Sequence, residues 1–243
     1  MLVSIVTVSY NSQNTIRRTI ESVLNQTYGH IEYWIIDGLS SDRTVDIARE
    51  YETAFKAKGY QYHIVSEKDQ GIYDAMNKGI AHCTGQIVGM INSDDWYEND
   101  AVWKAVDFWK KTKYDLMYAD LRIIKQSGNM IKKAKIRRFK TTRDWNHPTM
   151  FVRKEVYDKY QYENKALYDD YDLFLKVNAA GYKVCVLNEI LANFTFGGAS
   201  NQKDLKKMIA RIKMRYRNYR KNGYSRFYIF ECILMEVVKF ALS

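Results

Sequence analysis

Two adjacent carboxylates, Asp94 and Asp95, stand directly after an apolar stretch of the chain. That stretch, residues 86–91, has the continuous apolar character of a buried strand. Ligands of open α/β folds bind at the carboxyl ends of parallel strands, so the pattern predicts a site for a metal ion and a phosphate. Asp is also a preferred helix cap, and a helix predicted from Glu98 leaves that alternative open.

A second acidic cluster, residues 168–172, precedes the pattern of an amphipathic helix that ends at Gly181. Acids near a helix N-terminus are favoured by the helix dipole, so Asp169, Asp170 and Asp172 also fit an ordinary helix start. A glycine just beyond the last apolar position is typical of a helix C-terminus. Catalysis and capping therefore both remain open for these acids.

The first hundred residues alternate between strand and helix patterns. Strands are expected at residues 2–9, 31–36, 60–65 and 86–91, and helices after residues 14–15 and 41–42 and at residues 72–82. Such alternation predicts right-handed crossovers and a parallel sheet. The stretch contains neither a G-x-G-x-x-G after a strand nor a P-loop, which argues against the usual dinucleotide and P-loop folds.

The alternation ends after a helix predicted at residues 98–111. Strand-like segments follow at residues 114–120, 121–124, 130–136 and 149–152, with a turn at residues 126–129. We therefore expect mixed or antiparallel strands here, forming the acceptor side of a cleft.

The composition is that of an ordered globular protein: 243 residues, 47% apolar, with a single proline. This length suits one large α/β domain with or without an appendage. Cys83, Cys185 and Cys232 form no close pair, so we expect reduced thiols and no zinc site. The N-terminus lacks the pattern of a signal peptide, which leads us to expect a cytoplasmic protein.

The net charge of +10 is unevenly distributed. Residues 122–143 and 203–226 each contribute +9, so the rest of the chain carries −8. Two basic segments on an acidic body suggest an anionic partner, either a membrane surface or nucleic acid.

The C-terminal region, residues 201–243, carries two helix patterns. Residues 203–222 form a basic helix, and residues 226–242 form a more apolar one. The second is shorter than the ~20 residues needed to span a bilayer. We expect it to lie on an anionic membrane surface, on the inner face of the cell membrane, or against the body of the protein.

Six motifs, taken in order, resemble those of inverting family 2 glycosyltransferases, most of all the bacterial enzymes of polysaccharide biosynthesis such as capsule and O-antigen. The resemblance covers residues 1 to about 200 and closes with residues 196–200. The matching stretches are VSIVTVSYN at 3–11, SVLNQTY at 22–28, IIDGLSSD at 35–42, DQGIYDAMNKG at 69–79, NSDD at 92–95 and DDYDL at 169–173.

The resemblance implies the GT-A fold, with a nucleotide-sugar half at residues 1–112 and an acceptor half at residues 113–200. It further implies transfer of a sugar, with inversion, from a nucleotide-sugar such as a UDP-sugar to a lipid-linked saccharide or growing glycan. A divalent metal, Mn²⁺ or Mg²⁺, would be held by Asp94 with Asp95 as the nearest substitute. Asn92 replaces the usual first Asp of the motif, which leaves one charge fewer at this site.

The resemblance also implies roles in binding the donor and acceptor. Contacts with the nucleotide-sugar or acceptor are expected from Thr7, Ser9, Tyr10, Asp37, Asn77, Asn92, Ser93 and His147. Asp37 would accept a hydrogen bond from the base, and Asn77 would lie on the substrate side. Ordinary strand-end polarity remains an alternative for Thr7 and Ser9, and a turn stiffened by Pro148 remains one for His147.

Asp170 matches the family's acidic pair and is the expected catalytic base. An inverting displacement needs a carboxylate within hydrogen-bond reach of the acceptor hydroxyl. Asp169 is expected to orient Asp170 or to raise its pKa, and Asp172 to cap the helix. A flexible lid is expected around residues 197–200, with Gly197, Gly198 and Ser200.

Three other functions were weighed. Tyr216, Tyr219 and Tyr224 lie among arginines, as in a nucleic-acid-binding surface. A catalytically silent membrane-surface protein on the same fold is a second alternative. A nucleotidyltransferase is the third, although the chain lacks its glycine-rich phosphate loop. Because a nucleic-acid-binding module leaves the acidic body and the six motifs unexplained, we expect no nucleic-acid partner.

Overall fold

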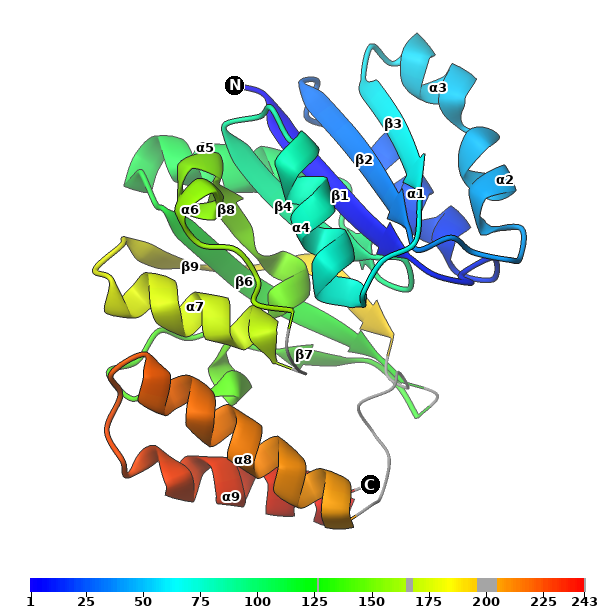
Figure 1. Ribbon diagram of the computed structural model, residues 1–243. Coiled ribbons are helices and arrows are strands. Elements are labelled where there is room, and N and C mark those ends of the chain that lie inside the picture. The colour runs from blue at the N-terminus through cyan, green and yellow to red at the C-terminus, as the bar shows by residue number, and fades with distance from the viewer. Residues whose placement is uncertain (126, 165–167, 196–204, 243) are drawn as a thin grey trace.

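The computed structural model describes residues 1–125, 127–164, 168–195 and 205–242. Its centre is one mixed sheet with strands in the order β3-β2-β1-β4-β8-β6-β9-β5, and β7 pairs with β6. Figure 1 shows helices on both faces of the sheet and a C-terminal pair, α8 and α9, below it. The predicted α/β class and the C-terminal helices are confirmed.

Four parallel strands form the N-terminal half of the sheet. They are β1 (Val3–Ser9), β2 (Ile31–Asp37), β3 (Gln61–Ser66) and β4 (Ile87–Asn92). The connecting helices are α1 (Ile16–Leu24), α2 (Thr44–Arg49), α3 (Glu52–Ala57) and α4 (Ile72–His82). Every residue of β1 is buried, as expected for a central strand covered on both faces. The predicted parallel alternation is therefore correct.

A second short helix, α3, follows the helix predicted after residues 41–42. The chain breaks between α2 and α3 at Glu50 and Tyr51, although the apolar pattern continues through this point. The Tyr51 hydroxyl donates to Glu21 Oε1 over 2.6 Å and accepts from Arg17 Nη1 over 2.9 Å. Tyr51, at the break between α2 and α3, is thus bound to α1. These contacts have no local pattern in the sequence.

The second half of the sheet is mixed, as predicted. Its elements are β5 (Trp96–Tyr97), α5 (Ala101–Thr112), β6 (Leu116–Ile124), β7 (Met130–Lys132), β8 (Phe151–Arg153), α6 (Lys154–Lys159), α7 (Asp169–Ala179) and β9 (Val184–Thr195). Strand β8 runs antiparallel to β4 and β6, whereas β9 runs parallel to β6. The sequence did not predict β9, in which only residues 191–193 are fully buried and the apolar signal is weak.

The C-terminal helices α8 (Leu205–Lys221) and α9 (Tyr228–Leu242) form a hairpin that buried ion pairs hold together. Arg215 Nη2 lies 2.9 Å from Glu231 Oε1, and Arg211 Nε lies 2.7 Å from Glu236 Oε2. Losing one partner of such a pair costs about 3–5 kcal/mol, so the hairpin has one strongly preferred arrangement. Within the described part of the chain, no helix is long and apolar enough to cross a membrane.

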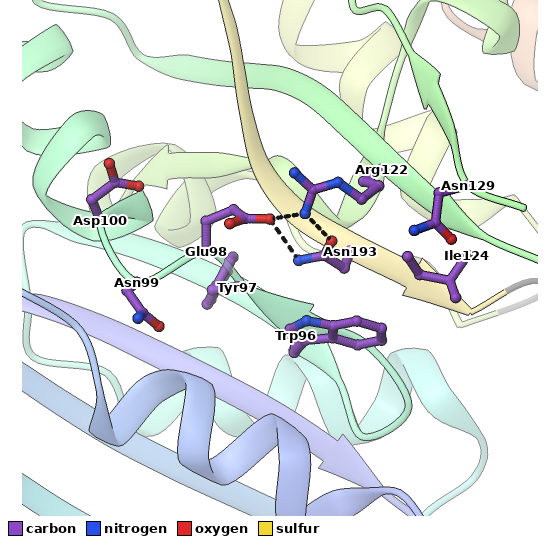
Figure 2. Close-up of a pocket in the computed structure, with 9 residues that line it drawn as sticks. All are labelled: Trp96, Tyr97, Glu98, Asn99, Asp100, Arg122, Ile124, Asn129 and Asn193. Carbon is purple, nitrogen blue, oxygen red and sulfur yellow. Dashed lines mark hydrogen bonds and ion pairs between the residues drawn. The ribbon is translucent and has the colours of Figure 1, made fainter.

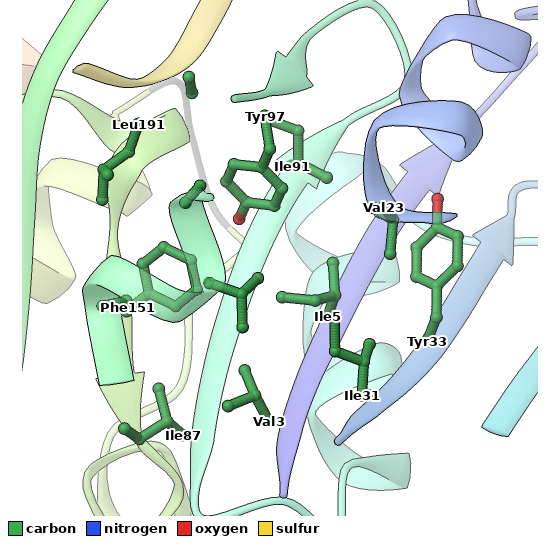
Figure 3. Packing of buried hydrophobic residues seen from close by; sticks show 14 of the residues in the cluster. Val3, Ile5, Val23, Ile31, Tyr33, Ile87, Ile91, Tyr97, Phe151 and Leu191 are labelled. Carbon is green, nitrogen blue, oxygen red and sulfur yellow. The ribbon is translucent and has the colours of Figure 1, made fainter. Parts of the chain in front are cut away.

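Alternate residues of β1 face two different hydrophobic cores. Val3 and Ile5 belong to a core that includes residues of α1, α2, α3 and α5. Figure 3 shows both side chains in this core, with Val23 of α1 on one side and Phe151 on the other. Val6 and Val8 belong to the core under α4, α6 and α7. This two-sided packing fixes the register of β1, because a shift by one residue would exchange the two faces.

Gly79 explains how closely α4 approaches the sheet. A Cβ atom at this position would lie 2.4 Å from Val6 Cγ1, so a larger residue does not fit. The glycine lets α4 lie directly on β1, with its N-terminal end beside the carboxyl ends of the strands (Figure 1). Packing is therefore a sufficient reason for this motif glycine.

The three cysteines are free, as expected. Cys83 and Cys232 are buried in the core, and Cys185 on β9 is partly buried. Burial raises the pKa of both Cys83 and Cys232 to about 12, which makes them poor nucleophiles.

Candidate active site

Polar residues of the sequence motifs gather at the edge where parallel strands end. The sheet register places Val8 beside Asn92 and Ser9 beside Asp37. A hollow of about 900 Å³ opens at this edge. Residues from four motifs line it, among them Ser9, Tyr10, Gly38, Asp69, Ile72, Asn92, Ser93 and Asp94. The structure therefore brings most of the predicted donor-side residues to one place.

Asp94 and Asp95 lie in the turn after β4 and do not cap a helix, because the N-cap of α5 is Asp100. Asp94 faces the hollow, whereas Asp95 is fully buried. Burial raises the pKa of Asp94. The pKa of Asp95 is raised well above its usual value, both by deeper burial and by the neighbouring charge of Asp94. A cation bound beside this pair of carboxyls, one partly exposed and one buried, would favour their ionised forms.

Two buried oxygens at this turn have no hydrogen-bond partner: Asn92 Oδ1 and Asp95 Oδ2. The described residues include no cluster of three or more His, Cys, Asp or Glu side chains able to hold a metal. Mg²⁺ sites of nucleotide enzymes commonly use one or two carboxylates and take further ligands from substrate phosphates. The two acids and the unpartnered oxygens fit this kind of site.

Arg18 of α1 holds the acidic turn in place, a role that the sequence did not reveal. Its Nη2 donates to the carbonyl of Asp94 over 3.0 Å and to Thr195 Oγ1 over 3.0 Å. Its guanidinium lies 3.5 Å from the centre of the Trp96 ring. The backbone N–H of Thr195 donates in turn to Asp95 Oδ1 over 3.3 Å. Helix α1 and the end of β9 therefore fix the turn from two sides.

Thr7 and Asp37, both expected to contact the nucleotide, are buried and engaged with the protein itself. Asp37 accepts hydrogen bonds from the hydroxyls of Ser9, Ser40 and Ser66 and from the backbone N–H of Ser40. Thr7 Oγ1 accepts from the Tyr33 hydroxyl over 2.9 Å. Neither belongs to the lining of the hollow.

Asp69 is the carboxylate that reaches the hollow on this side. A Cβ at Gly38 would lie 2.3 Å from Asp69 Oδ2, so the glycine leaves room for this carboxylate. Asp69 Oδ1 accepts a hydrogen bond from the N–H of Gly71 over 2.9 Å. Asp69 begins a motif quoted from the sequence, but nothing in that motif distinguished it from its neighbours.

The side chain of Asn77, predicted on the substrate side, binds the backbone of a distant segment. Its Nδ2 donates to the carbonyl of Tyr162 over 2.8 Å, and its Oδ1 accepts from the N–H of Tyr162 over 3.0 Å. Both polar atoms of the amide are thereby used to attach α4 to the chain before α7. Ser93, by contrast, lines the hollow and lies 2.7 Å from the Ser12 hydroxyl.

Asp170 lies in the first turn of α7, among groups from three other segments. Burial lowers the pKa of His147, and the charge of Asp170 opposes that shift. Burial raises the pKa of Tyr73, and Asp170 adds to it. Burial lowers the pKa of Lys132 to about 8, against the charge of nearby carboxylates that include Asp170. The charge of Asp170 therefore acts on His147, which was predicted to lie near the acceptor, and on Tyr73 and Lys132, which carry no sequence signal.

The acids around Asp170 are placed differently from one another. Asp169 is buried. Asp172, which we expected to cap the helix, lies inside α7, whose N-cap is Tyr168. Its carboxylate binds Lys221 Nζ over 2.6 Å and Asn222 Nδ2 over 2.7 Å. The capping prediction is wrong because α8 supplies partners from fifty residues further along the chain.

The first turn of α4 connects the donor hollow to Asp170. Ile72 and Ala75 line the hollow, and the intervening Tyr73 interacts with Asp170. Figure 1 shows the N-terminal end of α7 near the same end of α4 and below the carboxyl end of β1. The two acidic clusters of the sequence thus lie on either side of one helix end. The expected lid residues Gly197, Gly198 and Ser200, together with the closing motif at 196–200, fall outside the described residues.

The model of the family described as glycosyl transferase family 2 matches residues 4–168 of this chain. The chain belongs to glycosyl transferase family 2. This membership confirms the family that the sequence motifs resemble.

Curated relatives of this family 2 chain include glycosyltransferases of bacteria. It is 32% identical over 133 residues to a putative teichuronic acid biosynthesis glycosyltransferase, TuaG, of Bacillus subtilis (strain 168), covering 54% of this chain and 51% of the relative. It is 31% identical over 189 residues to a chondroitin synthase of Escherichia coli, covering 74% of this chain and 27% of the relative. The chain spans about half or less of the length of these two relatives.

Solved structures show the same fold. S. aureus TarS residues 1–349 in complex with UDP-GlcNAc matches with a TM-score of 0.70 at 16% identity, over 100% of this chain and 74% of that one. The mannosyltransferase PcManGT of Pyrobaculum calidifontis, in complex with GDP-Man and Mn²⁺, matches with a TM-score of 0.67 at 16% identity. The match covers 99% of this chain and 70% of that one. The predicted GT-A fold is confirmed by this likeness.

Proposed function

We propose that this family 2 protein transfers a sugar from a nucleotide-sugar, a UDP-sugar in the first instance, to a hydroxyl of a lipid-linked saccharide or growing glycan. The observation that carries the proposal is the hollow at the ends of β1 and β4, lined by Ser9, Tyr10 and the Asn92–Asp94 turn. The solved relatives named above were captured with UDP-GlcNAc and with GDP-Man. A bacterial polysaccharide acceptor fits the teichuronic acid and chondroitin relatives.

A divalent ion, Mn²⁺ or Mg²⁺, would be held by Asp94, with Asp95 next to it. The two unpartnered oxygens at this turn support that assignment, as does the Mn²⁺ in the mannosyltransferase complex. The ion would neutralise the charge that develops on the leaving diphosphate. Asn92 would bind a ribose hydroxyl, and Arg18 would keep the Asp94 backbone in position.

On the acceptor side, Asp170 would act as the general base of an inverting displacement. It would take the proton of the acceptor hydroxyl while that oxygen bonds to the anomeric carbon and the bond to the nucleoside diphosphate breaks. His147 and Tyr73 beside Asp170 would orient the acceptor, and buried Asp169 would support the base. Inversion would require that the base and the leaving group lie on opposite sides of the sugar.

The acceptor would be reached from an anionic membrane surface on the cytoplasmic side. Exposed apolar side chains occupy one face of α9, namely Phe230, Ile233, Leu234, Val237 and Val238. Helix α8, which packs against α9, carries the exposed basic residues Lys213, Arg217 and Arg220, and each Lys or Arg near an anionic leaflet contributes about 1 kcal/mol. An apolar face flanked by basic residues is typical of interfacial helices.

The decisive experiment compares Asp94→Asn and Asp170→Asn with a matched control, Asp158→Asn, an exposed acid of α6. Sugar transfer to lipid-linked and soluble glycan acceptors is measured across a panel of UDP-sugars, with Mn²⁺ and with EDTA. Each of the first two variants should lose at least ~10²-fold in rate, because each removes a group that acts in the transition state. Folded variants that transfer sugar at the rate of the control would exclude the proposed roles.

A further inference from the structure

A second hollow, of about 600 Å³, lies on the small sheet formed by β5, β9 and β6. Trp96 and Tyr97 of β5, Arg122 and Ile124 of β6 and Asn193 of β9 line it, together with residues 98–100 and Asn129. None of these residues lines the donor hollow. Its volume is in the range of small-molecule sites.

The centre of this hollow is a fixed set of polar groups. Arg122 Nη1 donates to Asn193 Oδ1 over 2.8 Å and forms an ion pair with Glu98, and Asn193 Nδ2 donates to Glu98 Oε1 over 3.0 Å. Figure 2 shows these three side chains meeting at the centre, with Asp100 and Asn99 on one side and Asn129 and Ile124 on the other. Arg122 and Asn193 belong to strands β6 and β9, and the three polar groups satisfy one another, so they form a fixed wall of the hollow.

The ring of Trp96 forms one wall of this hollow. Figure 2 shows its ring lying edge-on below Asn193 and Ile124. The Arg18 guanidinium lies 3.5 Å from the ring centre and thereby holds the indole in place. A flat, immobilised aromatic face beside polar groups suits a ligand that is apolar on one face and polar at its edge.

The charges in this hollow are paired. Glu98 pairs with Arg122, and Asp100 pairs with Lys104 at 3.0 Å. Among the described residues, the side-chain amides of Asn99 and Asn129 have no hydrogen-bond partner, and each can both donate and accept. A lining with balanced charge and free amides favours neutral hydroxyl groups over phosphate or carboxylate.

We propose that this hollow is a subsite for a neutral saccharide, separate from the donor hollow, with Trp96 as the stacking platform and Asn99 and Asn129 as the hydroxyl-binding groups. The choice of a saccharide over another polyol rests on the proposed glycan acceptor. The subsite would hold a sugar unit of that glycan away from the reacting hydroxyl.

The test uses the full chain with ¹⁵N-labelled asparagine, titrated with cellobiose and with N-acetyllactosamine to about 10 mM, ten times a millimolar dissociation constant. Side-chain amide signals of Asn99 and Asn129 should shift, in the presence and in the absence of UDP. Asn129→Ala should weaken binding ~5-fold, the effect of one lost hydrogen bond. Asn188→Ala, at an exposed asparagine of another hollow, should leave binding within about twofold.

Absence of shifts with both disaccharides, or equal weakening by Asn129→Ala and Asn188→Ala, would overturn the subsite. A UDP titration of the same sample separates this outcome from failure of the proposed function. Shifts of Asn92 with UDP but none of Asn129 with disaccharide would remove the subsite alone. The opposite pattern would remove the donor site and leave the subsite in place.

Discussion

The carboxylate of Asp37 is surrounded by donors of the protein itself, whereas that of Asp69 faces the donor hollow. A buried carboxylate with several donors is a strong structural element, because removing its acceptor capacity leaves donors unsatisfied. We therefore infer that Asp69 is better placed than Asp37 to meet a nucleotide base directly.

Asp37→Asn should lower the free energy of unfolding by about 1–3 kcal/mol, since the new amide donates where an acceptor is required. Asp69→Asn should change stability little but weaken UDP binding. Thermal unfolding and UDP titration of the two variants measure both effects. A stable Asp37→Asn protein that fails to bind UDP would instead restore the original assignment of Asp37 to the base.

Burial of His147 makes the stability of the protein depend on pH, and the direction of that dependence follows from the burial. Burial lowers its pKa in the folded protein, while the unfolded chain takes up a proton below about pH 6.5. The free energy of unfolding should therefore fall as the pH drops below ~6.5, because the unfolded state binds more protons. Urea unfolding between about pH 7.5 and 5 measures the slope. His147→Gln should flatten it, and His30→Gln, on the surface, should not.

At the scale of elements, helix α8 braces the start of α7. Tyr168, the residue before the acidic cluster, has a φ of 75°, a left-handed conformation that costs a residue with a side chain about 1–2 kcal/mol. Asn218 Nδ2 donates to the carbonyl of Tyr168 over 3.2 Å, and the Tyr168 hydroxyl donates to Glu236 over 3.2 Å. The C-terminal hairpin thus stabilises the turn that carries Asp170.

Asn218→Leu removes one of these contacts at nearly constant volume. We expect kcat to fall ~10-fold with little change in KM for the donor, because the base is displaced while the donor hollow is intact. Lys213→Ala, an exposed change on the same helix, is the control. Steady-state kinetics measures both constants. A rise in the donor KM with unchanged kcat would contradict the positioning role.

At the scale of the whole molecule, the two basic segments of the sequence meet beside α9. Phe139 stacks on Tyr228 with ring centres 4.3 Å apart, and Thr141 Oγ1 donates to Glu231 Oε1 over 2.7 Å. Residues 139–141 and helix α8 therefore both pack against α9. Segments separated by some sixty residues contribute to one candidate membrane surface.

Phe230 is 67% exposed and Leu234 is 62% exposed on this face. The double variant Phe230→Asp, Leu234→Asp should lose most of its sedimentation with anionic vesicles, because it removes buried apolar area and adds two like charges. Trp103→Ser, at an exposed aromatic of α5, is the matched control. Equal sedimentation of the two proteins, or sedimentation with neutral vesicles alone, would argue against this surface.

The sequence by itself determined the parallel half of the sheet, the GT-A fold and the family. Strand and helix patterns are local, and parallel strands must end at the same edge, so the gathering of Ser9, Tyr10 and Asp94 followed from their order along the chain. The catalytic candidates also lay in these motifs. Six motifs that occur in the order of the family made their assignment specific. For these features, local pattern and family likeness were enough.

Only the tertiary structure decided what each polar side chain binds. Asp37 meets Ser66, Asn77 meets Tyr162 and Asp172 meets Lys221, each partner arriving from a distant segment. A hydrogen bond depends on the position of both atoms within a few tenths of an ångström, which packing sets and periodicity does not. For the same reason, three features have no signature in the sequence. They are the contacts of α8 with the start of α7, the hydrogen bonds of Arg18 to the acidic turn, and the polar hollow on β5, β9 and β6.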